Sequence, residues 1–248
     1  MNRILKKLRR MYLTARRVRA NTQFRDLHSG RRCVIIGNGP SVRLDDLEAL
    51  AGRYTTFCCN RFHMAYETTP FRPDYTVMID PYMIGDFGNE IARLAKTPVF
   101  AGHADIDRVP AGCYFLPLRG ETFKFSPDIR RFVSTGDSVI AAAVQIASFM
   151  GMKEIYLYGI DHSLHFEKQT APGSGLVLGE GNHFIKGYRS GRPWCPPNVG
   201  NIEHALRACD DALRTQNGFL KNATRGGHLE VLERVDFDQL VVNYNAAV

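Results

Sequence analysis

The sequence predicts an α/β fold in which a mostly parallel sheet is covered by helices on both faces. Short β-branched and apolar segments alternate along the chain with segments of helical length and pattern. The strand segments are apolar at successive positions, which is typical of parallel strands buried on both sides. With 248 residues, 44% of them hydrophobic, the chain is long enough for one large domain with a substantial core.

Glycine, proline and polar clusters set the expected limits of each element. The expected strands cover residues 33–37, 55–59, 75–79, 98–101, 113–116, 154–158, 218–222 and 229–232. The expected helices cover residues 44–50, 89–94, 137–150 and 200–215. The third of these helices is apolar almost all round, which predicts that it is buried, and Ser134 or Thr135 is expected to cap its N-terminus.

The positive charge of the chain is concentrated at its N-terminus. Residues 1–32 hold eleven Lys and Arg and one acid, so the remaining 216 residues carry −3 of the total formal charge of +7. Apolar residues recur there every three or four positions, as on one face of an amphipathic helix: Ile4, Leu5, Leu8, Met11, Tyr12 and Ala15. The sequence therefore divides into a basic amphipathic arm, 1–30, and a nearly neutral globular domain, 31–248.

Such an arm can lie on an anionic membrane, pack on the body or on a second copy, or bind nucleic acid. We expect membrane contact through residues 1–20 and no nucleic-acid binding, because the body has no basic surface interleaved with aromatic residues; a homo-oligomer is also compatible. No apolar run approaches the roughly 18–20 residues that span a bilayer, and no secretory signal pattern follows the charges. The six cysteines form no Cys-x-x-Cys pair, which favours reduced thiols. The expected location is cytoplasmic, at the inner face of the membrane.

The segment 33–41, Cys-Val-Ile-Ile-Gly-Asn-Gly-Pro-Ser, is the most informative stretch of the chain. A strand, a glycine-rich turn and a helix follow one another there, which is typical of a phosphate- or nucleotide-binding corner. The turn lacks the third glycine of a dinucleotide motif and the Gly-Lys-Ser/Thr of a P-loop. Asn38 and Ser41 add polar side chains where a ligand's oxygens would lie. The alternative is an ordinary tight turn between a strand and a helix.

Polar or small residues follow three other predicted strands. Asn60 follows the strand at 55–59, Asp80 follows the strand at 75–79, and Gly159-Ile160-Asp161 follows the strand at 154–158. Because ligands bind at the carboxyl ends of parallel strands, we expect these residues to form one site. The segment Ser134-Thr135-Gly136 offers hydroxyl groups and backbone N–H groups at a helix start, a second position for an anion.

Together these motifs resemble those of the bacterial CMP-sialic-acid-dependent sialyltransferases. The ordered set is 35–41, Cys-Asn-Arg-Phe at 59–62, Ser-Thr-Gly at 134–136, Lys-Glu-Ile-Tyr-Leu-Tyr-Gly-Ile-Asp at 153–161 and Asn-His-Phe at 182–184. The chain resembles at least as closely the broader group named after the MptE-like 6-hydroxymethylpterin diphosphokinases. That group shares its fold with the motility accessory factors, which transfer nonulosonate sugars to flagellin. The similarity covers roughly residues 31–235, but only the short motifs are specific.

The resemblance implies a Rossmann-like nucleotide-sugar domain that requires no metal or other cofactor. It implies that His183 is the general base, and histidine suits that role because its ordinary pKa lies near ~6.5. The residues implied to bind the CMP part of the donor match the family motifs at Gly37, Asn38, Gly39, Ser41, Asn60, Ser134, Thr135, Gly136, Gly159, Ile160 and Asp161.

The sequence departs from the sialyltransferase pattern at two places. His162 and Ser163 stand where that family has tyrosines that stabilise the departing phosphate, and Lys186, Tyr188 and Arg189 are the candidate substitutes. Asp80 replaces an asparagine, and a carboxylate beside a phosphate favours a divalent cation such as Mg²⁺.

The expected function is transfer of a sugar, a nonulosonate from a CMP donor, to a surface-glycan or lipid-linked acceptor. The alternatives are a pterin or nucleotide diphosphokinase that uses Mg-ATP through Asp80, and a non-catalytic nucleotide-binding module.

Overall fold

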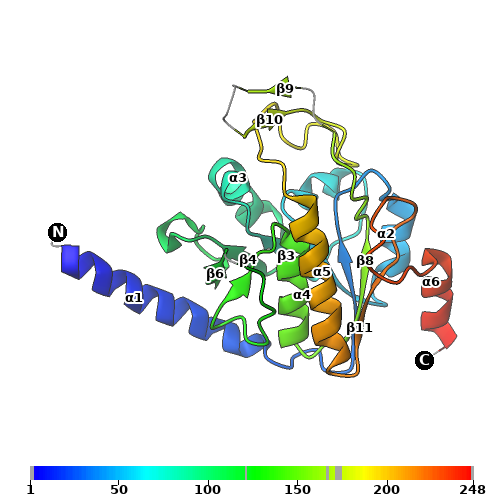
Figure 1. Cartoon of the computed structure of the whole chain (residues 1–248), viewed down its shortest axis with the longest axis horizontal. Helices are drawn as coiled ribbons and strands as arrows, with labels where there is room; N and C mark the ends of the chain where they lie inside the picture. The colour runs from blue at the N-terminus through cyan, green and yellow to red at the C-terminus, as the bar shows by residue number, and fades with distance from the viewer. Residues whose placement is uncertain (1–2, 121, 166–167, 171–174, 247–248) are drawn as a thin grey trace.

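The computed structural model describes residues 3–120, 122–165, 168–170 and 175–246. Its centre is a seven-stranded sheet in the order β11-β8-β1-β2-β3-β4-β5, in which every neighbouring pair is parallel (Figure 1). The seven strands are β1 (Arg32–Ile36), β2 (Thr55–Cys59), β3 (Tyr75–Met78), β4 (Val99–Gly102), β5 (Tyr114–Leu116), β8 (Glu154–Tyr158) and β11 (Phe219–Asn222). The sheet confirms the predicted Rossmann-like α/β class.

Two short pairs lie outside this sheet. β6 (Leu118–Arg119) pairs in parallel with β7 (Val133–Ser134), and β9 (Lys168–Gln169) pairs antiparallel with β10 (Val177–Leu178). The helices are α1 (Arg3–Ala20), α2 (Leu44–Leu50), α3 (Pro81–Leu94), α4 (Val139–Phe149), α5 (Val199–Arg214) and α6 (Phe237–Ala246), with short 3₁₀ turns η1 (Asn21–Phe24), η2 (Phe62–Glu67) and η3 (Ile106–Arg108).

Helices cover both faces of the sheet, and successive strand residues point to opposite faces. Cys33 and Ile35 of β1 pack with α4 and α5, whereas Val34 and Ile36 pack with α2 and α6. α3 covers the β3–β5 part of the second face, where Met78 and Ala101 belong to a separate cluster. The continuously apolar strands therefore fill a core on each side, as the sequence predicted. α4 is buried at almost every position, which confirms the expectation from its all-round apolar pattern.

Several predicted elements need correction. Residues 229–232 form no strand; Leu229 and Leu232 are buried, so this apolar run packs into the core as a loop. The helix predicted at 89–94 begins at Pro81, because Asp80 caps it: its Oδ1 accepts the Tyr82 N–H at 2.8 Å, and proline suits the first helical position. The cap of α4 is Ser138, whose Oγ accepts the Ile140 N–H at 3.2 Å, rather than Ser134 or Thr135.

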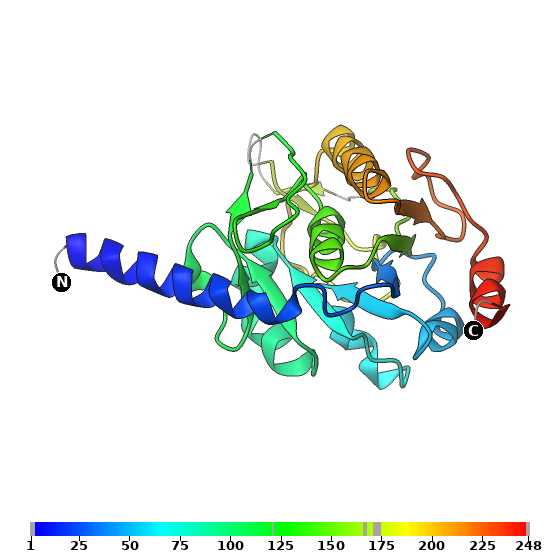
Figure 2. The same ribbon diagram turned by 90° about the horizontal axis from the view of Figure 1, so that it is seen from below.

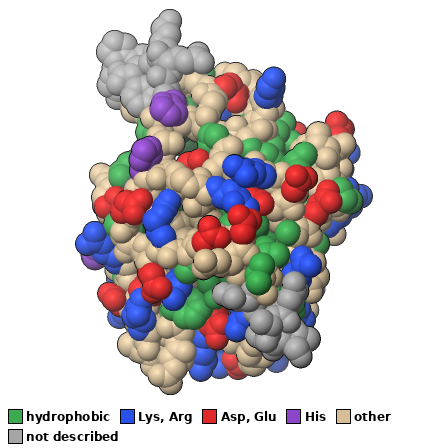
Figure 3. Space-filling model, turned by 90° about the vertical axis from the view of Figure 1, so that its right-hand side faces the viewer, with side chains coloured by type: hydrophobic (Ala, Val, Ile, Leu, Met, Phe, Trp, Pro, Cys, Tyr) green, Lys and Arg blue, Asp and Glu red, His purple; other side chains and the backbone are tan. Residues whose placement is uncertain are grey.

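α1 leaves the body at the β5 edge of the sheet and projects away from it, whereas α6 and the C-terminus lie at the other side (Figures 1 and 2). On the face that carries α2 and α6, basic and acidic side chains are interspersed (Figure 3). Among the described residues, no helix is both long and apolar enough to span a bilayer. All six cysteines are free thiols, and each except Cys195 is buried.

Candidate nucleotide site at the switch point of the sheet

The strand order changes direction between β1 and β8. From β1 the chain adds β2 to β5 on one side, then returns to place β8 and β11 on the other. The two neighbours run in parallel register from Arg32 opposite Glu154 to Ile36 opposite Tyr158, so the turns that follow them start side by side. Such a switch point is the usual ligand position in an open α/β sheet. Segments 37–41 and 159–161, which were expected at one edge of the sheet, lie side by side there.

The glycines of the two turns allow this close approach. A Cβ atom on Gly37 would overlap the Gly159 carbonyl oxygen and the Ile160 side chain, and a Cβ on Gly39 would overlap the Asp161 carboxylate. Gly159 has a φ of +70°, and a Cβ there would overlap Val42. These three glycines are therefore required by contact between the two strand ends, before any ligand is considered.

Ser41 and Asp161 are hydrogen-bonded to each other and connect the two turns. The Asp161 carboxylate accepts the Ser41 hydroxyl at 2.7 Å and the Ser41 backbone N–H at 3.1 Å. The Gly39 N–H donates to the Gly159 carbonyl at 3.0 Å, and the Ile160 N–H donates to Thr224 Oγ1 at 3.0 Å. The polar groups expected to contact a ligand are thus already hydrogen-bonded to one another, so their role in binding stays a prediction.

Asn38 and Asn60 carry hydrogen-bonding capacity that the described residues do not use. Asn38 Nδ2 donates to the Cys59 carbonyl at 2.9 Å and to the Tyr188 hydroxyl at 3.1 Å, whereas its Oδ1 is buried without a partner. Asn60 has a φ of +54°, and its Oδ1 is likewise buried without a partner. Buried polar atoms are almost always paired, so the orphan amide oxygens of Asn38 and Asn60 are candidate acceptors for the N–H or O–H groups of a ligand.

His183 lies beside these amides, although it is far away in the sequence. The Phe184 N–H donates to the Asn38 carbonyl at 2.9 Å and ties this segment to the turn after β1. The His183 ring stacks on the Tyr188 ring, with centroids 3.7 Å apart and planes 14° from parallel. Burial and then the nearby Arg189 cation lower the pKa of His183 to about 4. His183 is therefore neutral near pH 7, the form that can accept a proton.

The three candidate phosphate-stabilising residues lie in different surroundings. Lys186 is exposed, whereas Tyr188 and Arg189 are buried. The Tyr188 hydroxyl also accepts the Arg61 N–H at 3.3 Å, and burial raises its pKa well above the usual value. Arg189 donates to the Pro193 carbonyl at 2.6 Å and pairs with Asp86 at 3.4 Å, but its Nε is buried without a partner.

A cleft of about 940 Å³ opens next to His183. It lies between the start of α2, the η2 turn and the segment from Glu180 to Gly187, and it is lined by Pro40, Val42, Leu44, Met64, Ala65, Thr68, Glu180, Gly181, His183, Phe184, Ile185, Lys186 and Gly187. Mostly apolar walls with a few polar groups are typical of small-molecule sites. His183 is one of the residues that a ligand in this cleft would contact.

The segment 134–136 makes its contacts elsewhere. Ser134 is fully buried: its N–H donates to Gln145 Oε1 at 3.1 Å, and its Oγ accepts the Lys124 N–H at 3.2 Å. The Thr135 N–H donates to the Arg119 carbonyl at 3.2 Å, and a Cβ on Gly136 would overlap Ala205 of α5. In the described part of the chain, no hydrogen bond joins this segment to the turns after β1 and β8, so its place in a nucleotide site stays a prediction.

The comparison that decides the family is the match of a family model, 6-hydroxymethylpterin diphosphokinase MptE-like, to residues 3–166. The chain belongs to the MptE-like family. Among solved structures, it is similar to the MAf glycosyltransferase from Magnetospirillum magneticum AMB-1, with a TM-score of 0.49 and 14% identity. That alignment covers 95% of this chain but only 42% of the other, so the chain spans less than half of that relative's length.

The MptE-like chain is also similar to the sialyltransferase CstII from Campylobacter jejuni. The structure of CstII with cytidine-5'-monophosphate has a TM-score of 0.45 and 14% identity, with 84% of this chain and 86% of CstII covered. The structure with CMP-3FNeuAc has a TM-score of 0.42 and 15% identity, with 83% and 86% covered. A comparison with curated proteins finds no match.

Asp80 is the residue that, from the sequence, was expected to favour a divalent cation. One of its oxygens caps α3, which leaves the other for a ligand. Within the described ranges, no group of three or more His, Cys, Asp and Glu side chains is placed to hold a metal ion. A Mg²⁺ ion there would take one carboxylate oxygen from Asp80 and the rest of its ligands from substrate phosphates and water, as Mg²⁺ commonly does.

The sequence interpretation did not single out Arg61, which fixes the segment beside His183. Its side chain is 7% exposed, pairs with Glu90 at 2.9 Å, and lies 3.9 Å over the Phe87 ring. Its guanidinium also donates to the Tyr188 carbonyl and so fixes the Tyr188 segment against α3. The available signal was its position directly after Asn60, where a basic residue follows a buried strand.

The low pKa of His183 predicts a pH effect on stability. The unfolded chain binds a proton at the ordinary pKa near ~6.5, whereas folded His183 binds one only near pH 4, so the unfolding free energy falls as pH drops between these values. We expect His183 to contribute at most about 3 kcal/mol of this loss. Urea unfolding at pH 7 and pH 4.5, in the wild type and in His183→Gln, measures it. Equal losses in both proteins would contradict the prediction.

Proposed function

We propose that this protein is a glycosyltransferase that moves a nonulosonate sugar from a CMP donor to a surface-glycan or lipid-linked acceptor. The observation that carries the proposal is a neutral histidine held at the switch point of the sheet. The Phe184–Asn38 hydrogen bond places His183 beside the orphan amide oxygens of Asn38 and Asn60 and at the wall of the cleft. The motif resemblance implies that this histidine is the general base. It also implies that Asn38 and Asn60 bind the nucleotide of the sugar donor.

In the proposed reaction, the acceptor hydroxyl oxygen attacks the anomeric carbon of the sugar. The bond between that carbon and the phosphate oxygen breaks, and CMP leaves with the bonding electrons. The hydroxyl proton passes to an imidazole nitrogen of His183. The stacked Tyr188 ring fixes the imidazole plane, which limits the reorientation needed before proton transfer.

Arg189 supplies a second element of this mechanism. Its buried cation contributes to the low pKa of His183, and its Nε–H is without a partner. A donor phosphate near Arg189 would offset that charge and remove the smaller part of the lowering of the His183 pKa, whereas the larger part, which comes from burial, would remain. The base would then become stronger when the donor is bound, which suits proton transfer near neutral pH. Lys186, exposed at the cleft wall, would place a positive charge near the leaving phosphate and stabilise its negative charge.

A pterin or nucleotide diphosphokinase is the second candidate. The description of the family to which the chain belongs favours it, and the remaining oxygen of Asp80 could contribute to a Mg-ATP site. In that case the cleft beside His183 would bind the molecule that receives the pyrophosphate group from ATP. The two candidates differ in their nucleotide and in their need for magnesium.

Thermal-shift titration with CMP, CDP, UDP and ATP, each with and without magnesium, separates the candidates. We expect CMP to stabilise the protein without metal. At a concentration of 100 times the Kd, binding adds about 2.7 kcal/mol, which raises the Tm by several degrees in a chain of this size. Stabilisation by ATP alone, and only with magnesium, would overturn the glycosyltransferase proposal and support the diphosphokinase. Stabilisation by CMP without any transfer activity would favour a non-catalytic nucleotide-binding module.

A further inference from the structure

α1 has a C-terminal half that is fixed to the body. Arg17 donates to four backbone carbonyls around the η3 segment, those of Ile106, Val109, Pro110 and Cys113, at 3.4, 3.5, 3.1 and 3.0 Å. Leu13 and Val18 pack against the cluster formed with α3. Directly after the helix, buried Asn21 donates to the Phe115 carbonyl at 2.8 Å. The orientation of the helix relative to the sheet is therefore set by many contacts.

The opposite side of α1 carries an apolar stripe whose side chains are largely exposed to solvent. Its large members are 56–66% exposed: Ile4, Leu5, Leu8, Met11 and Tyr12. At 100° per residue these side chains form one face, here called the outer face, whereas Arg10, Leu13 and Arg17 lie diametrically opposite and face the body. Figures 1 and 2 show this part of the helix projecting beyond the sheet. Five large apolar side chains in one exposed stripe mark an interaction surface.

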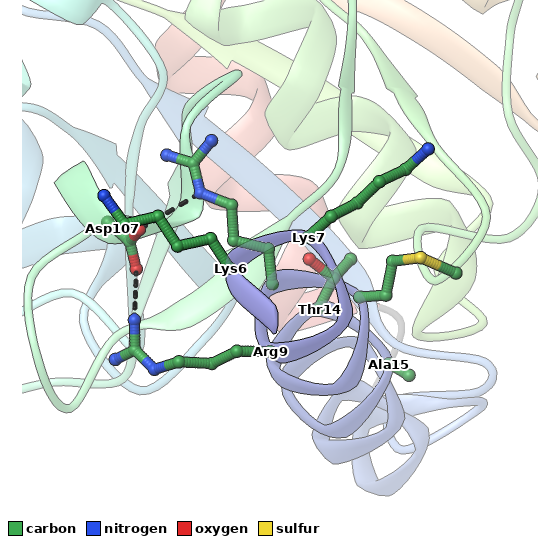
Figure 4. Close-up of a pocket in the computed structure, with 8 residues that line it drawn as sticks. Lys6, Lys7, Arg9, Thr14, Ala15 and Asp107 are labelled. Atoms are coloured by element: carbon green, nitrogen blue, oxygen red, sulfur yellow. Dashed lines mark hydrogen bonds and ion pairs between the residues drawn. The ribbon is translucent and has the colours of Figure 1, made fainter. Parts of the chain in front are cut away.

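Basic side chains flank the outer face, and α1 contains no acid. Arg10 is engaged by Asp105 and Asp107, and Arg9 lies 3.8 Å from Asp107. Of the other cations whose exposure is described, Lys7 and Arg16 are exposed at the two borders of the outer face and Arg19 is exposed on the outer face itself. Lys6 is exposed on the opposite side of the helix. Figure 4 shows Lys6 and Arg9 on the Asp107 side of α1, whereas Lys7 points to the other side of the helix.

We propose that α1 lies flat on an anionic lipid bilayer, with its outer face at the acyl boundary and its flanking cations among the headgroups. An exposed apolar stripe bordered by Lys and Arg is the chemistry of interfacial helices. Nucleic acid would neutralise the cations but leave the stripe in water. A second copy of the same face would bring two sets of cations together without any acid. Membrane binding by α1 would not depend on which reaction the switch-point site catalyses.

Vesicle sedimentation of the full-length protein tests this inference. We expect binding to vesicles with about one-third phosphatidylglycerol, and binding at least tenfold weaker to pure phosphatidylcholine vesicles or in high salt. The double variant Leu5→Ser/Leu8→Ser should reduce the partition coefficient at least tenfold. Lys7→Gln/Arg16→Gln should weaken it and reduce its salt dependence. Val242→Ser is the matched control, because Val242 is 63% exposed on α6, far from α1.

Circular dichroism melts should show that all variants keep the wild-type fold, since every altered side chain is exposed. Equal binding to neutral and anionic vesicles, or undiminished binding of the Leu5→Ser/Leu8→Ser variant, would overturn the proposal. Light scattering supplies a further test: a dimer that the same double variant dissociates would identify a second copy as the occupant of the outer face. Tight binding to short duplex DNA without binding to anionic vesicles would likewise overturn it.

Discussion

Replacing His183 with alanine is expected to reduce sugar transfer by about 10²–10⁴-fold, the usual contribution of a positioned general base. The imidazole lies at the cleft wall, is fixed by the stacked Tyr188 ring, and has a pKa of about 4 in the free protein. It is therefore unprotonated across the physiological pH range. The transfer rate of the wild type should fall only when the pH is lowered into the range where His183 gains a proton.

The measurement is a single-turnover transfer assay over a range of pH, together with a thermal-shift titration by the nucleotide. His183→Ala should keep nucleotide binding nearly unchanged and should lose the acid limb of the pH–rate profile. His204→Ala is the matched control, because His204 is an exposed histidine on α5 and should keep the wild-type rate. Loss of nucleotide binding in His183→Ala would instead place this residue in the donor pocket. Unchanged transfer would remove it from the mechanism.

The sheet could be predicted because its strands are buried on both faces. Such strands are continuous apolar runs that end abruptly, and the runs at 55–59 and 154–158 match β2 and β8 residue for residue. The same criterion failed at 229–232, since an apolar loop that packs into the core has the same composition as a short strand. The start of α3 was missed because Asp80-Pro81 was interpreted as a strand end alone, although a cap followed by proline also begins a helix.

The members of the site could be predicted better than their interactions. Polar residues after strands identified Asn38, Asn60 and Asp161, because parallel strands end at one edge. The burial of Tyr188 and its stacking on His183 depend on a segment that returns from beyond β10 to the turn after β1. No local pattern encodes that return. The pKa of His183 depends on the same packing and on Arg189, so it required the structure.

The glycines of the first turn illustrate a further limit of sequence interpretation. Their pattern predicted a backbone that approaches a ligand closely, whereas the structure shows that Gly39 lies against the turn after β8. Either reason forbids a side chain, and the sequence alone does not distinguish them. A substitution that is measured without ligand does distinguish them, because only the contact between the two strand ends acts in the free protein.

Replacing Gly39 with alanine is therefore expected to destabilise the free protein strongly. The new Cβ would overlap the Asp161 carboxylate and would lie 2.7 Å from the Gly159 carbonyl oxygen, which is backbone and cannot rotate away. Forcing extra volume into a closely packed contact costs typically about 1–3 kcal/mol. Separation of Asp161 from Ser41 would leave partly buried polar groups poorly paired and add about 1 kcal/mol. Urea unfolding without nucleotide measures the total, with Gly120→Ala, where nothing lies within 4 Å, as the matched control.

A double variant separates the two contributions to this loss. Asp161→Ala alone should destabilise the protein because it removes two hydrogen bonds from Ser41. Gly39→Ala/Asp161→Ala should lose less than the sum of the two single losses, since the carboxylate that the new methyl group meets is then absent. The Gly159 carbonyl still obstructs the Cβ, so rescue should be partial. Additive losses, or a Gly39→Ala protein as stable as the wild type, would contradict the contact between the two turns and return the glycine to a role in ligand binding alone.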